Sequence, residues 1–221
     1  RRTQAPSMSI KCTANEQVKR LYFHFLEHAD GKSEASIKQV NIALGRFEDF
    51  TGHADFRTFD QKQAVAFKED MRSRNLAPAT ILATVKQVMR FLNWLASTQP
   101  GYKSRIRRDA IDYMNLSEKT VRAACAPRDR DYPTLGMVEA AIDAMPCETS
   151  IEKRDRALVA ISALTAIRVK ALTTLKLKHF DRRRFLIIQQ PDQVQTKFSK
   201  RIDTFLVPVS EKIEAIFLEW I

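Results

Sequence analysis

Apolar residues recur every three or four positions along the first part of the chain. Four segments show this spacing: 18–26, 37–47, 64–71 and 81–95. Because this period places the apolar side chains on one face of a helix, we predict four amphipathic helices. Asp60, with Gln63 three residues later, is suited to cap the third helix, and Pro78 is suited to the start of the fourth.

The helical pattern is interrupted after residue 122. Residues 123–133 mix charged residues with two prolines and show no periodicity, which predicts a linker. Beyond it, Thr134 is suited to cap a helix. The run TSIE at 149–152 fits a capping box, which predicts the start of a buried helix that extends to about residue 166.

The period then changes from that of a helix to that of a strand. Two strand-like runs, 185–188 and 204–209, flank the segment 193–201. We predict a small three-stranded antiparallel sheet here, with a turn near 198–201. A final helix is expected to begin near Ser210.

The pattern as a whole predicts a mainly α protein with a small antiparallel β-sheet. Only 5 glycines occur in 221 residues, and a scarcity of helix breakers favours helices over a fold with many turns. The predicted organisation is a helical domain at 12–122, a linker at 123–133 and a second, mixed α/β domain at 134–221.

The amino-acid composition indicates which partners and cofactors to expect. The chain has 37 basic and 26 acidic residues, a net charge of +11, and such a surface attracts polyanions, with nucleic acid as the first candidate. The 3 cysteines are far apart and form no metal-binding spacing, so we predict a reduced intracellular protein without a zinc site. We expect no cofactor. No apolar run is long enough to span a membrane, so we expect no membrane partner.

One basic residue is placed unusually. The apolar helix predicted at 152–166 is followed at once by Arg168. Its guanidinium could be satisfied by helix-end carbonyls or a carboxylate, which on physical grounds alone is the more common arrangement. It could instead be aimed at a phosphate, to which the planar fork donates two hydrogen bonds. These residues alone leave both alternatives open.

Several runs around this arginine resemble the tyrosine recombinase (phage integrase) family. They are LTAIR at 164–168, the apolar positions that follow it up to Asp181, RDRAL at 154–158, TLGMVE at 134–139, and QTKFSKR at 195–201 with FLVP at 205–208. The resemblance implies a helical SAM-like core-binding domain at 12–122. It also implies that 134–221 is the N-terminal part of a mixed α/β catalytic domain.

The family cuts and rejoins DNA without a metal, through a tyrosine that forms a 3′-phosphotyrosyl link. The resemblance implies that Arg168 stabilises the transition state and that Lys197 is the general acid, with Lys200 as the second choice. The chain departs from the family at Ala166, where a glycine is usual, and at Lys170-Ala171, where Ser-Glu is usual.

No tyrosine follows Tyr132, and no histidine follows His179. We therefore expect this chain to be part of a longer protein and to bind DNA without cutting it. The intact protein would be a site-specific recombinase or integrase of a mobile element, working as a homo-multimer on paired duplex sites in the bacterial cytoplasm, at the nucleoid. The alternative is a non-catalytic DNA-binding protein on a degenerate recombinase fold.

Basic residues off the apolar stripes are the candidate phosphate contacts, and we expect about half of them to touch DNA. These candidates are Lys38, Arg46, Lys86, Arg90, Arg105, Arg107, Arg108, Lys170, Lys200 and Arg201. The competing interpretation is a solvated face on a helical interaction module whose basic charge is incidental.

Overall fold

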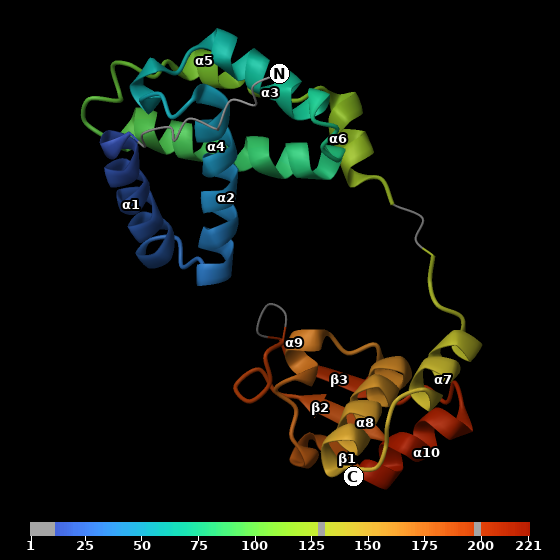
Figure 1. The fold of residues 1–221 in the computed structure, drawn as a ribbon. Helices are drawn as coiled ribbons and strands as arrows, with labels where there is room; N and C mark the ends of the chain where they lie inside the picture. Colours follow the sequence, from blue (N-terminus) through green and yellow to red (C-terminus); the bar gives the residue numbers. More distant parts are fainter. Residues whose placement is uncertain (1–11, 128–130, 197–199) are drawn as a thin grey trace, which may run out of the picture. The chain divides into compact units, whose positions relative to one another are not determined.

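The computed structural model describes residues 12–127, 131–196 and 200–221. The chain divides into two compact units, Arg1–Arg128 and Asp129–Ile221, and each is described by itself (Figure 1). In the described residues the protein is mainly helical, with one small three-stranded antiparallel sheet. This confirms the coarse fold class that the hydrophobic pattern predicts.

The first unit is helical throughout its described part. Its elements are α1 (Thr13–His28), α2 (Glu34–Thr51), a 3-10 turn η1 (Phe56–Thr58), α3 (Gln61–Ser73), α4 (Pro78–Thr98), α5 (Arg108–Asp112) and α6 (Glu118–Cys125). The four predicted helices are confirmed as α1 to α4. Because α6 extends to Cys125, the first three residues of the predicted linker are helical.

Local signals and a shared core explain this unit. The Gln63 N–H donates to Asp60 Oδ1 over 2.8 Å, so the predicted N-cap of α3 is confirmed. Pro78 is the first residue of α4, where its missing N–H leaves no bond unmade. The apolar stripes meet in one core with several fully buried aromatic rings, among them Tyr22, Phe47 and Phe91. Each such ring stabilises the fold by about 1.5–3 kcal/mol through burial.

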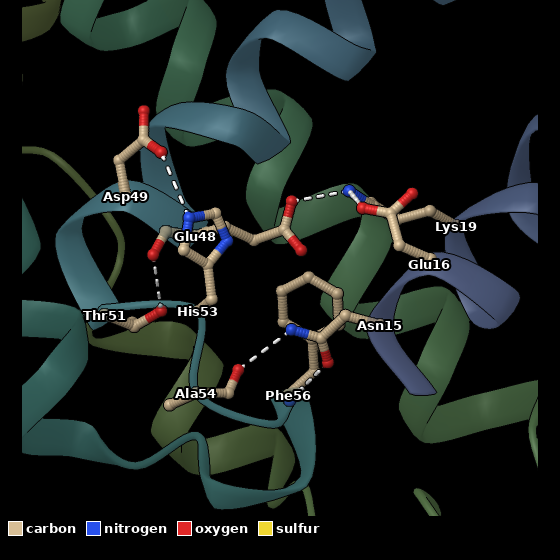
Figure 2. Close-up of polar contacts among 9 residues, drawn as sticks. All are labelled: Asn15, Glu16, Lys19, Glu48, Asp49, Thr51, His53, Ala54 and Phe56. Carbon is tan, nitrogen blue, oxygen red and sulfur yellow. Dashed lines mark hydrogen bonds and ion pairs between the residues drawn. The ribbon is translucent and has the colours of Figure 1, made fainter. Parts of the chain in front are cut away.

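A polar cluster lies inside this unit, where α1, α2 and η1 meet (Figure 2). The ammonium of Lys19 lies 2.6 Å from Glu48 and 2.7 Å from Glu16. Asn15 donates to the Ala54 carbonyl over 2.9 Å and accepts from the Phe56 N–H over 3.1 Å. These contacts tie α1 to α2 and to the loop before η1.

The second unit packs helices against the sheet. Its helical elements are α7 (Leu135–Asp143), α8 (Ser150–Thr165), α9 (Val169–Leu172), the 3-10 turn η2 (Leu177–His179) and α10 (Glu211–Trp220). Its strands are β1 (Phe180–Asp181), β2 (Leu186–Gln189) and β3 (Ile202–Phe205), in the order β1-β2-β3. The capping box that Thr149 and Glu152 form at the start of α8 is confirmed.

The sheet differs in two details from the prediction. β1 precedes both predicted runs, and its two residues were too few to give a pattern. β3 ends at Phe205, whereas the predicted run continued to 209. The reason is a bond outside the sheet: the Val207 N–H donates to the Leu164 carbonyl over 2.8 Å, which draws the chain to the end of α8.

Candidate nucleic-acid interface

Arg168 lies at the turn between α8 and α9. The helix α8 ends at Thr165, and Ala166 takes the left-handed conformation with φ 50° and ψ 28°. The Ala166 N–H still donates to the Ser162 carbonyl over 2.9 Å, which closes the last turn of α8. The backbone then leads directly into α9, with Arg168 at its N-cap and its side chain exposed.

A small polar pocket of about 70 Å³ opens beside this arginine. Its lining comes from the α8–α9 turn, from α9, from β2 and β3, and from the segment between them: Thr165, Ala166, Ile167, Arg168, Ala171, Gln189, Thr196, Ile202 and Thr204. Gln189 donates through Nε2 to Thr204 Oγ1 over 2.8 Å. The hydroxyl of Thr196 is buried and has no hydrogen-bond partner in the described residues. Among the described residues that line the pocket, none carries a carboxylate.

The Arg168 guanidinium makes no hydrogen bond or ion pair with any residue that the structure describes. Helix-end carbonyls or a carboxylate would be its partners in the structural alternative, and the described part of the chain supplies neither. A cation held at a tight turn, with its donors unused, is available to an anion in solution. Such an arginine can donate to a phosphate without first breaking an ion pair.

The other basic candidates of this unit differ in their partners. Lys170 and Lys200 are exposed, and within the described ranges neither ammonium has an ion-pair partner. Arg201 is bound by Asp203, with Nε–Oδ1 and Nη2–Oδ2 distances of 3.0 Å each, and this hydrogen bond raises the pKa of Arg201. Lys197 lies outside the described residues, as do two residues of the predicted turn.

In the first unit, three of the seven candidates have acidic partners. Lys38 pairs with Glu34 over 2.7 Å, Arg90 pairs with Asp30, and Arg107 pairs with Asp109. Exposed pairs of this kind are worth roughly 1 kcal/mol or less, so they do not prevent a cation from turning to a phosphate.

The other four candidates of this unit have no acidic partner in the described residues. Arg46 donates to Thr84 Oγ1 over 2.9 Å and is therefore held against α4. Lys86, Arg105 and Arg108 are exposed. Together with Lys170 and Lys200, these three are the cations that could contact phosphates without first breaking an ion pair.

The fold also brings together basic residues that the sequence pattern did not connect. Lys62 lines a surface depression of about 390 Å³ together with Arg105 and Arg107, although some forty positions separate it from them in the chain. Asp60 and Asp109 lie at the same depression, so its charge is mixed. Sequence spacing carries no signal for this meeting, because it depends on how α3 packs beside the 101–108 segment.

Among the described residues, no group of three or more His, Cys, Asp or Glu side chains lies close enough together to hold a metal ion. His179 is buried, with Nδ1 accepting from the Lys176 N–H over 3.0 Å and Nε2 lying 3.2 Å from Gln193 Oε1. Both of its ring nitrogens are therefore used within the fold.

No helix in the described ranges has the length and apolar character needed to cross a bilayer. No model of a known protein family matches the chain. No curated protein shows significant sequence similarity to it. The resemblance to tyrosine recombinases therefore rests on the motifs quoted above.

Proposed function

We propose that this chain binds duplex DNA through its phosphates. The observation that carries the proposal is Arg168, exposed at the α8–α9 turn, with no partner among the described residues and with Lys170 two positions away. A guanidinium donates two parallel bonds to a phosphate, and the described lining of the pocket beside it includes no carboxylate that would compete. The net charge of +11 adds long-range attraction.

We further propose the finer assignment that the motifs imply. Residues 12–122 would be a helical SAM-like core-binding domain, and 134–221 the N-terminal part of a mixed α/β recombinase catalytic domain. The intact protein would cut and rejoin duplex DNA at specific sites through a 3′-phosphotyrosyl intermediate, as a homo-multimer in the bacterial cytoplasm. Arg168 would stabilise the transition-state charge, and Lys197 would protonate the leaving oxygen.

One observation favours a second candidate, a non-catalytic DNA-binding protein. Ala171 is 2% exposed and lines the pocket beside Arg168, at the place where the family's acidic residue would lie. A methyl group cannot orient a guanidinium as a carboxylate does. An arginine without that support can still bind a phosphate, but it is less well held for stabilising a transition state.

The first experiment measures binding of the chain to duplex DNA over a series of salt concentrations. If about half of the ten candidate cations contact phosphates, the slope of log K against log[salt] is about −4.5, and affinity falls by about 500-fold between about 50 and 200 mM salt. Binding that is absent at low salt, or insensitive to salt, contradicts the proposal and favours a helical interaction module with incidental charge.

A second experiment separates the recombinase from the non-catalytic binder. The intact protein is isolated from producing cells under denaturing conditions, and the DNA that stays attached is measured after nuclease treatment. A tyrosine-linked nucleotide supports strand cleavage. Retention of salt-sensitive DNA binding without any covalent link supports the non-catalytic alternative.

A further inference from the structure

Two histidines lie one turn apart near the end of α1, outside the residues proposed to contact DNA. The ring centroids of His24 and His28 are 4.3 Å apart, with an angle of 59° between the ring planes. Both residues are exposed, and Glu27 Oε2 lies 3.8 Å from His28 Nε2. The pair therefore presents two imidazole rings side by side on one solvent-facing surface, and no third His, Cys, Asp or Glu among the described residues completes a ligand group with them.

The helix holds these two rings in place. Residues four apart lie above one another on a helix, so their side chains meet on the same face. Two histidines at this spacing are a recurrent way to present two nitrogens to one metal ion. The α-helix includes both residues, since α1 extends from Thr13 to His28, and the neighbouring Leu26 anchors this turn in the core.

We propose that His24 and His28 form a chelating site for a divalent transition-metal ion on the surface of α1. Imidazole suits Ni²⁺, Cu²⁺ and Zn²⁺, whereas Mg²⁺ and Ca²⁺ prefer oxygen ligands. Because the chain supplies two nitrogens here, water completes the coordination. The site is open, unlike the four-ligand centres that hold a small fold together.

The chemistry of the ligands sets an order of affinity and a dependence on pH. With two imidazole ligands, Cu²⁺ binds more tightly than Ni²⁺, and Ni²⁺ more tightly than Co²⁺. Each imidazole must present an unprotonated nitrogen, so binding weakens as the solution becomes acidic and releases protons when it occurs.

The test is a Ni²⁺ titration of the full chain by calorimetry. Cys12, Cys125 and Cys147 are first replaced by serine, because their thiols are competing ligands. We expect one site, and we expect His24→Asn and His28→Asn each to weaken Ni²⁺ binding by at least about tenfold, because the second ligand of a chelate binds at high effective concentration. The far-UV circular dichroism spectrum of each variant checks that α1 is intact.

A rescue variant distinguishes a chelate from binding to single imidazoles. Arg20 is exposed and lies four residues before His24, so Arg20→His in the His28→Asn background rebuilds the same spacing one turn earlier. We expect this change to restore most of the affinity for Ni²⁺. Unchanged affinity in either single variant, or failure of the rescue, overturns the proposal.

Discussion

The buried ammonium of Lys19 gives the sharpest test of how the first unit is held together. The side chains of Lys19 and Glu48 are 7% and 5% exposed and their charged atoms are 2.6 Å apart, whereas Glu16 is more accessible (Figure 2). Burial lowers the pKa of Lys19, but hydrogen bonds to Glu16 and Glu48 raise it, and the net pKa is higher than the ordinary value. Lys19 is therefore charged at neutral pH.

Replacing Lys19 by methionine keeps most of the volume and removes the charge. The Glu48 carboxylate is then buried without its cation, and we expect the first unit to lose about 3–5 kcal/mol of its free energy of unfolding. Glu48→Gln should cost less, roughly 1–3 kcal/mol, because Glu16 still accepts from the ammonium. Lys19→Met combined with Glu48→Met leaves no buried charge, and it should be more stable than Lys19→Met alone by about 2 kcal/mol or more.

The assay is urea unfolding followed by tryptophan fluorescence. The chain has 2 tryptophans, and Trp94 lies in the first unit with its ring centroid 5.0 Å from that of Tyr22. In a Trp220→Phe background, fluorescence reports on the first unit alone. The loss of unfolding free energy caused by Lys19→Met should be smaller in acid, because a protonated Glu48 carboxyl costs less to bury than a carboxylate. This reasoning is refuted if Lys19→Met lowers the free energy of unfolding by less than about 1 kcal/mol, or if the double variant with Glu48→Met is no more stable than Lys19→Met.

Three further predictions concern single side chains. The buried hydroxyl of Tyr22 has no hydrogen-bond partner in the described residues, so Tyr22→Phe should keep or raise stability by up to about 1 kcal/mol in urea unfolding. Burial raises the pKa of Tyr22 to about 12 from its ordinary value of 10.0. The stability that its neutral phenol contributes is therefore fully present below pH 10 and is lost as the pH rises toward 12. Tyr22→Phe should reduce this loss of stability in alkaline solution. Ala166 has φ 50°, so Ala166→Gly should stabilise the second unit by about 1 kcal/mol, whereas the same change at the helical Ala160 should destabilise it. Thr149→Ala removes the capping box of α8 and should cost about 1 kcal/mol in thermal unfolding of that unit.

The features that sequence reasoning predicted well are those whose causes are local. The period of apolar residues determines which face of each helix is buried, and a cap such as Asp60 or Thr149 acts within three residues of itself. The left-handed conformation of Ala166 was not predicted, although its cause is also local, because a residue at the end of a helix often takes it.

The features that it missed depend on contacts between distant segments. From the sequence alone, Lys19 would be expected to face solvent, because lysine is rarely buried without an ion-pair partner. Its partner Glu48 lies on another helix, 29 positions away in the chain. The end of β3 depends on the bond between Val207 and Leu164, which a strand pattern cannot contain. The pocket beside Arg168 likewise needs Gln189 and Thr204 from two strands.

The measurement that tests the central claim most directly compares DNA binding by Arg168→Ala with that by Arg154→Ala. Both variants lose one positive charge from the second unit, but Arg154 is paired with Asp155 and lies outside the proposed surface. We predict that Arg168→Ala weakens binding by about tenfold and makes the salt dependence shallower by about one unit of slope, while Arg154→Ala stays close to the wild-type chain. Equal effects of the two variants, or no effect of Arg168→Ala, would contradict the assignment of Arg168 to a phosphate.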